Sequence, residues 1–393
     1  MKHKLLPSSP KAQAQQRLAK QCYWDEVEQT LWIDGRKEVP SIGVIEVMSW
    51  DRMMLDSSPI PDYPIELMVF EWSNYSQLSY WRKQIPKWVS DSCALFPTHQ
   101  LTLLHYCGKY PQILELLDHA PLLAWRLISS GLEEPEIVAL LAGKRVDIAA
   151  QVGWPGKEET VKFLRNLRLR WVNQEIAEQV EVCLMDDRRL QALQSLPRIN
   201  SMALSLAARF PELIGCRLHQ ALAQLPCRPM QCQSMVALLE DAYRLAENLG
   251  LSENEVARIG NSRYLIEVTE IYQSWLNVAM ESALDGDEGS MAPLIDRLQV
   301  SSKPFEVLSE LGDWIQLSIK QQHAWITDYL QEVDSRSGIL IAWLDDGKLW
   351  AALIDRDPDL DHSEILRVRG EENSLPSSKQ LADLHLWQAT GKL

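Results

Sequence analysis

The clearest alternation of hydrophobic and polar positions lies near the end of the chain. Residues 339–344 and 349–354 are short runs of branched and aromatic residues, which are typical of β-strands. Between them, Asp346-Gly347 predicts a tight hairpin turn, because the two central residues of such a turn need positive φ. Residues 365–369 alternate again and predict a third strand. We therefore expect a small C-terminal α+β module with a β-hairpin and a third strand, closed by a helix.

The middle of the chain has the hydrophobic period of α-helices. Short apolar segments follow one another, and proline or glycine separates them, for example at Pro197, Pro211 and Gly250. No fixed repeat length emerges. The pattern is typical of an irregular helical repeat or bundle, so the fold is predicted to be mainly α.

The N-terminal part has the least regular pattern. The segment 41–50 predicts a strand, 22–33 fits a helix or a strand, and 65–72 fits a strand or a buried helix. The acidic, glycine-rich stretch 285–290 predicts a linker. The predicted organisation is a mixed region over 1–75, a helical domain over 76–284 and an α+β module over 291–393.

Composition limits the function classes. The formal net charge of −15 opposes a general nucleic-acid coat, because the phosphate backbone is itself negative. Seven scattered cysteines fit reduced cytosolic thiols and lack zinc-site spacing. No apolar stretch is long enough to span a membrane, and no phosphate-loop or dinucleotide motif occurs. We predict a cytoplasmic protein with no cofactor, no metal and no membrane contact.

One basic segment departs from this acidic background. Residues 157–171 are predicted to form one helix, and Lys162, Arg165 and Arg168 then fall on one face. This face is the best candidate for binding nucleic acid or an acidic partner. The alternative is an exposed helix whose charges pair with neighbouring glutamates.

The closing strand carries the most specific motif, Arg369-Gly370-Glu371-Glu372-Asn373. Arg369 can grip a phosphate or carboxylate, and Asn373 can hold a base edge. The structural alternative is that Gly370 supplies positive φ and Asn373 forms a turn. Arg367 shares a strand face with Arg369, which gives either a small basic binding patch or, more simply, a solvated face.

Two parts of the chain resemble the PcfJ-like proteins of conjugative plasmids and other mobile elements. In the helical part, the resemblance rests on residues 207–214 and 241–246. In the C-terminal part, it rests on the motif at 369–373, followed by Pro376 and Trp387, with Gly312 and Tyr329 before the hairpin. The resemblance covers roughly residues 90–393.

Where the family carries a His-Cys-Val-like triplet, this chain has Leu317-Ser318-Ile319. A histidine beside a cysteine can supply a thiolate and a proton carrier, whereas leucine and serine cannot. The resemblance therefore implies a non-catalytic interaction or regulatory protein of a mobile element or defence system, acting on a protein partner. The alternative is a nucleic-acid-processing or nucleotide-dependent enzyme that uses Ser318, Arg369 and Asn373.

A serine–histidine–aspartate set at Ser318, His323 and Asp328 is not favoured by the sequence. Positions five apart on a helix are rotated by roughly 140°, so these side chains would not share one helix face.

Overall fold

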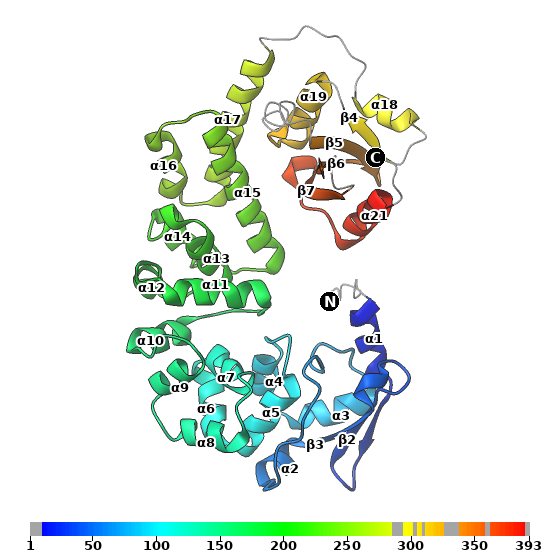
Figure 1. Ribbon diagram of the computed structural model, residues 1–393, viewed down its shortest axis with the longest axis vertical. Coiled ribbons are helices and arrows are strands. Elements are labelled where there is room, and N and C mark those ends of the chain that lie inside the picture. Colours follow the sequence, from blue (N-terminus) through cyan, green and yellow to red (C-terminus); the bar gives the residue numbers. More distant parts are fainter. Residues whose placement is uncertain are drawn as a thin grey trace. The chain divides into compact units, whose positions relative to one another are not determined.

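A computed structural model describes residues 10–284, 294–301, 305–308, 311–325, 338–357 and 362–389 (Figure 1). The chain forms two compact units. Unit 1 comprises Met1–Gly215 and His219–Pro229, and unit 2 comprises Cys216–Leu218 and Met230–Leu393. Unit 1 thus joins the N-terminal region to most of the predicted helical domain, and unit 2 joins the last long helices to the C-terminal module. The predicted linker at 285–290 lies outside the described residues.

The predicted fold class is confirmed: the chain is mainly helical and ends in a small antiparallel sheet. A second small sheet lies at the N-terminal end of unit 1, in the order β1-β2-β3. Its strands are β1 (Cys22–Asp25), β2 (Thr30–Asp34) and β3 (Val44–Met48), which confirms the strand expected within 41–50.

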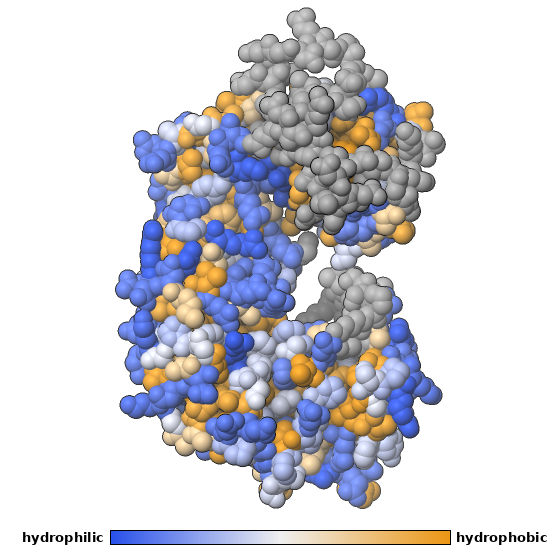
Figure 2. Space-filling view, in the orientation of Figure 1, coloured by the Kyte–Doolittle hydropathy of each residue, from blue (hydrophilic) through white to orange (hydrophobic). Residues whose placement is uncertain are grey.

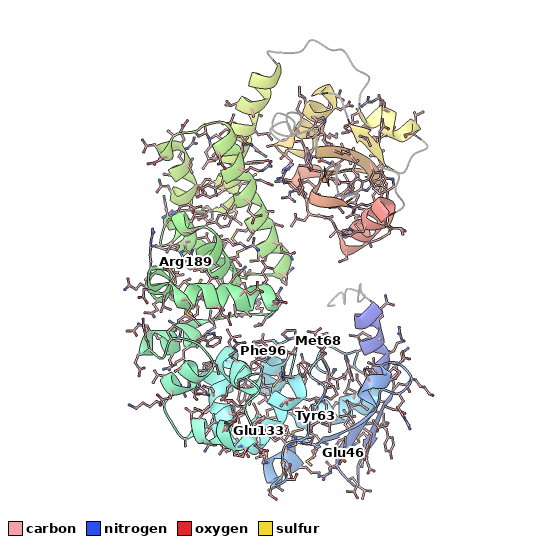
Figure 3. The ribbon with its side chains drawn as sticks, in the orientation of Figure 1. Glu46, Tyr63, Met68, Phe96, Glu133 and Arg189 are labelled. Carbon is pink, nitrogen blue, oxygen red and sulfur yellow. The ribbon has the colours of Figure 1, made fainter. Side chains whose placement is uncertain are left out.

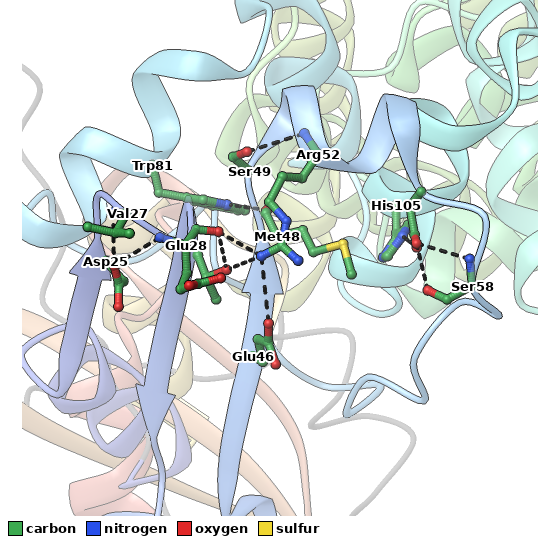
Figure 4. A network of polar contacts seen from close by, with 12 residues as sticks. Asp25, Val27, Glu28, Glu46, Met48, Ser49, Arg52, Ser58, Trp81 and His105 are labelled. Carbon is green, nitrogen blue, oxygen red and sulfur yellow. Dashed lines mark hydrogen bonds and ion pairs between the residues drawn. The ribbon is translucent and has the colours of Figure 1, made fainter.

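Arg52 ties this sheet to the helix that follows it (Figure 4). Arg52 lies on α2 (Trp50–Leu55), and its Nη1 donates to the carbonyl of Glu28 and to Oγ1 of Thr30. Trp81, which is fully buried, donates its indole N–H to the carbonyl of Met48. These contacts hold the sheet against the helices that follow it.

The rest of unit 1 is a succession of short helices. Their bounds are α1 (Pro10–Leu18), α3 (Ser76–Gln84), α4 (Lys87–Cys93), α5 (Gln100–Lys109), α6 (Pro111–His119), α7 (Pro121–Ile128), α8 (Glu134–Leu141), α9 (Arg145–Gln151), α10 (Glu158–Asn166), α11 (Gln174–Met185), α12 (Asp187–Gln194) and α13 (Ser201–Arg209). A further helix, α14 (Arg217–Leu222), begins with two residues assigned to unit 2 and continues in unit 1. Several begin at side chains that suit a helix start, such as the N-caps Asn173 and Asn200 and the first-turn prolines of α6 and α7.

Two local predictions in unit 1 are wrong. Residues 65–72 form turns and irregular backbone rather than a strand or helix, although Leu67, Val69 and Trp72 are buried. The helix predicted over 157–171 ends at Asn166, after which Leu167 forms a parallel bridge with Ile199.

Unit 2 combines long helices with the C-terminal sheet. The helices are α15 (Pro229–Asn248), α16 (Glu253–Asn261), α17 (Leu265–Leu284), α18 (Leu294–Val300), α19 (Leu311–Gln321) and α21 (Ser378–Ala389). The strands are β4 (Glu306–Leu308), β5 (Gly338–Asp345), β6 (Lys348–Asp357) and β7 (His362–Gly370), in the order β4-β5-β6-β7. All neighbouring strands in this sheet are antiparallel.

The predicted hairpin is confirmed, since Asp346 and Gly347 both have positive φ between β5 and β6. Two strands are longer than predicted: β7 begins at His362, and β6 continues to Asp357, past its predicted end at residue 354. The short strand β4, which pairs with β5, was not predicted. It has only three residues, too few for a period to show.

Each face of this sheet packs against helices (Figure 1). On one face, Leu349, Ala351 and Leu353 of β6 form a core with residues of α18 and α19. On the other, Trp343 and Trp350 form a core with Leu384 and Trp387 of α21. The sheet is therefore the middle layer of a small three-layer module.

No helix in the described part of the chain is both long enough and apolar enough to cross a membrane. On the face drawn in Figure 2, hydrophobic residues are interspersed with hydrophilic ones.

Candidate functional site: a buried cluster around Asp241

Asp241 of α15 is the centre of a buried polar cluster in unit 2. Its side chain is 3% exposed. Its Oδ2 accepts hydrogen bonds from Nη2 of Arg369 and Nδ2 of Asn373, each at 3.3 Å. Nδ1 of His323 lies 3.3 Å from the same oxygen. One carboxylate oxygen thus receives the three groups that come from the C-terminal module.

Two further arginines flank the other carboxylate oxygen. Nη2 of Arg244, one helical turn further along α15, lies 3.7 Å from Oδ1 of Asp241, and Nε of Arg367 lies 4.0 Å from it. Asp241 therefore has cationic side chains on both sides.

The pairing register of β6 and β7 determines the sheet face to which the two arginines of the C-terminal module point. Arg367 and Arg369 of β7 pair with Leu353 and Ala351 of β6, so they point to the same face of the sheet as the core formed with α19. The prediction that they share one strand face is confirmed. The expectation that this face is solvated is wrong, because Arg369 is 8% exposed and the Arg367 side chain 18% exposed.

Gly370 is needed for close packing and not for positive φ. Its φ is −111°, which contradicts the predicted role. A Cβ at this position would lie 2.6 Å from Oγ of Ser374 and 2.8 Å from the Trp350 ring. The turn conformation is supplied by Glu372 and Asn373, whose φ values are 55° and 56°. Asn373 therefore forms the turn, as expected, and also directs its amide to Asp241.

His323 reaches the cluster from the end of α19. Gln322 has a positive φ, and the His323 N–H donates to the carbonyl of Ser318. The next N–H, of Ala324, donates to the Tyr272 hydroxyl on α17, and the Trp325 ring meets the His323 ring edge-on at 4.4 Å. These contacts fix the orientation of the imidazole.

The charges in the cluster follow from its burial and its cations. Burial opposes ionisation of Asp241, but the hydrogen bond from His323 and the charges of Arg369 and Arg244 outweigh that cost and hold its pKa far below the ordinary value. Burial lowers the pKa of His323, and Arg369 and Arg244 add to that effect while Asp241 opposes it. His323 is therefore neutral near pH 7, and the arginines are the cations that keep Asp241 ionised.

The tautomer of His323 follows from its neighbour. Because the carboxylate of Asp241 can only accept, the Nδ1 that faces it carries the hydrogen, and Nε2 keeps a lone pair. Within the described part of the chain, Nε2 of His323, Nε of Arg369 and Oδ1 of Asn373 are buried without a hydrogen-bond partner. A neutral imidazole held by a carboxylate is an arrangement that general-base catalysis uses.

The cluster contains Arg367, Arg369 and Asn373 from the predicted site. The remaining catalytic candidate, Ser318, is fully buried on α19, and its backbone carbonyl accepts a hydrogen bond from the His323 N–H. Two cavities lined by described residues lie elsewhere, one between α16 and α17 and one in unit 1. Asp328, proposed and disfavoured as a triad member, lies outside the described residues.

The predicted basic face does not form as one helical stripe. Lys162 and Arg165 are exposed on α10, but Arg168 lies beyond its end. Nη1 of Arg168 donates to the carbonyls of Arg165 and Leu167, as a cation does at a helix C-terminus. The three cations are therefore not presented by a single helix face.

Sequence reasoning missed Asp241 altogether and named His323 only as a disfavoured triad member. Asp241 looks like an ordinary charged helix residue, and its partners Arg369 and Asn373 lie 128 and 132 residues away in the sequence, so no local signal marks it. The sequence has no cysteine after Cys232, so the C-terminal module carries no thiol.

Within the described residues, no group of three or more histidine, cysteine, aspartate or glutamate side chains could hold a metal ion. Comparison of the chain with protein-family models, with curated proteins and with solved structures finds no match.

Proposed function

We propose that this chain is a non-catalytic interaction or regulatory protein, of the kind that the PcfJ-like resemblance implies for mobile elements and defence systems. The short helices of unit 1 form the scaffold that meets a protein partner. The C-terminal module, with its motif at 369–373, is a structural element rather than a reaction centre.

One observation carries this proposal: Arg369, Asn373 and His323 all direct polar atoms to Asp241. Arginine and asparagine that bind a phosphate or a base present these same donors to the ligand. Here the donors meet an internal carboxylate 128 and 132 residues away in the sequence. The motif therefore acts as a clamp between β7 and α15, and the missing thiol removes the nucleophile that the family pattern would offer.

Affinity purification of the tagged chain from its native cells tests the proposal. Bound protein and nucleic acid are identified with and without nuclease treatment. We expect a protein partner that remains after nuclease treatment and that a His323→Gln variant also retains. Recovery of nucleic acid alone, or loss of every partner on nuclease treatment, would contradict the proposal and favour the nucleic-acid binder.

A second candidate is a nucleic-acid-processing or nucleotide-dependent enzyme, and the observation that favours it is the unpartnered Nε2 of His323. Labelled single- and double-stranded DNA, RNA and nucleoside triphosphates are incubated with the purified wild type and with His323→Gln. The interaction proposal predicts no turnover by either protein. Cleavage or hydrolysis by the wild type that His323→Gln loses, while its unfolding midpoint stays close to wild type, would establish the enzyme instead.

A further inference from the structure

Unit 1 contains a small, half-open cavity of about 230 Å³ that is unrelated to the Asp241 cluster. Its apolar walls come from three places in the sequence: the segment after α4, the start of α7 and the end of α10. Phe96, Leu122 and Leu164 are nearly fully buried residues of these walls (Phe96 is labelled in Figure 3). Two charged side chains of opposite sign, Asp118 and Arg168, complete the lining.

The walls are held by contacts that do not depend on a ligand. Phe96 stacks on Trp125 with ring centroids 5.3 Å apart and an interplanar angle of 3°. The indole N–H of Trp125 donates to the carbonyl of Thr98. The N–H of Val172 donates to the carbonyl of Leu95, which joins two walls directly. The cavity is therefore formed in advance, as ligand sites usually are.

The Arg168 guanidinium at the cavity is held in place by some of its N–H donors and keeps others for a ligand. Nη1 of Arg168 donates to two backbone carbonyls at the end of α10. In the described part of the chain, no residue accepts from its Nε or Nη2, and no ion pair joins it to Asp118. Asp118 is 62% exposed, and among the described residues its one ionic contact is with the neighbouring His119, at 3.7 Å. One cation and one anion thus line the cavity with donors and acceptors available.

We propose that this cavity binds a free α-amino acid with an aromatic or branched apolar side chain. An apolar cavity of about 150 Å³ takes up benzene, so a somewhat larger one holds a ring or branched side chain together with the head group. The ligand carboxylate bonds to Arg168, the ammonium group bonds to Asp118, and the side chain lies against Phe96 and Leu122.

The opposite charges of Arg168 and Asp118 favour a zwitterion over a ligand with one charge. Arg168 and Asp118 both line the cavity, so a carboxylate without an amine, or an amine without a carboxylate, has an opposite charge to bind at only one of them. A zwitterion satisfies both, because its two charged groups lie on one carbon atom.

Isothermal titration calorimetry on the full chain tests the proposal with L-phenylalanine, L-leucine and L-tryptophan at millimolar concentrations. We expect saturable binding of at least one of them and none of L-serine, which lacks the apolar body. Arg168→Gln and Asp118→Asn should each weaken binding about tenfold, as expected for the loss of a charge-assisted hydrogen bond. Arg165→Gln, an exposed arginine on the same helix end, is the matched control and should leave the affinity unchanged.

Ligand analogues that lack one charged group or both test the proposed ligand class on the wild type, so this test does not depend on the stability of a variant. Phenethylamine and 3-phenylpropionate should each bind the wild type about tenfold more weakly than phenylalanine. Equal binding of 3-phenylpropionate would overturn the role of Asp118, and equal binding of N-acetyl-phenylalaninamide would instead assign the cavity to a side chain of a protein partner. Absence of binding by all three amino acids would overturn the proposal altogether.

Discussion

Replacing Asp241 by asparagine removes one charge from the centre of the buried cluster and changes its volume little. Three groups, from Arg369, Asn373 and His323, share Oδ2 at 3.3 Å. Each hydrogen bond to a charged group contributes about 1.5 to 3 kcal/mol, and breaking a buried ion pair costs about 3 to 5 kcal/mol. These contacts are longer than the shortest charge-assisted bonds, so the lower end applies. We expect Asp241→Asn to destabilise unit 2 by about 3 kcal/mol.

Native-state amide hydrogen exchange, read by mass spectrometry, measures this loss locally. Peptides from α15 and β7 should lose protection together, because the variant removes the contact that joins them. Peptides from α6 and α7, in unit 1, serve as an internal reference. Glu247→Gln, an exposed position on the same helix, is the matched control. If Asp241→Asn lost no more amide protection in α15 and β7 than Glu247→Gln does, the reasoning would be refuted.

Three further predictions follow from local geometry. His219 accepts from the N–H of Gly215 and donates to the carbonyl of Ala203, and burial lowers its pKa to about 4, below the unfolded value of about 6.5. Because the unfolded chain binds the extra proton, the contribution of His219 to stability is complete above pH 6.5 and falls by up to about 3 kcal/mol as the pH drops to 4. Urea unfolding at several pH values should therefore show that the free energy of unfolding of His219→Gln depends less steeply on pH than that of wild type. An equally steep pH dependence would contradict this assignment. Gly370→Ala should lower stability by about 1 to 3 kcal/mol through its clash with Trp350, and thermal unfolding that matches wild type would show that the strand can shift. Asn200→Ala, which removes the N-cap of α13, should cost about 1 to 2 kcal/mol in the same assay, whereas no change would show that the cap is dispensable.

Periodicity and turn chemistry were enough to predict much of the fold. The hairpin at Asp346-Gly347 was predictable because it depends on residues that are adjacent in the sequence. The helical pattern of the middle region was predictable for the same reason. The end of α10 at Asn166 was not, because Leu167 there pairs with Ile199, and a pairing of segments 32 residues apart leaves no local signal.

The candidate site was predictable only in part. The motif at 369–373 marked Arg369 and Asn373, but not the residue that they bind. Asp241 lies 128 residues before Arg369 and has the ordinary appearance of a charged helix residue. The expectation that Arg367 and Arg369 form a solvated face was wrong, because a buried carboxylate on a helix distant in the sequence offsets the cost of burying them. Such pairing becomes visible only when the two segments are placed in space.

A double-mutant cycle between Asp241 and Arg369 tests the clamp most directly. Unfolding free energies of unit 2 are measured by hydrogen exchange for wild type, Asp241→Asn, Arg369→Met and the double variant. If Arg369 is held by Asp241, its replacement costs much less once the carboxylate is gone, and the coupling energy is about 2 kcal/mol. Additive losses, with a coupling energy below about 0.5 kcal/mol, would contradict the structural role assigned to the motif.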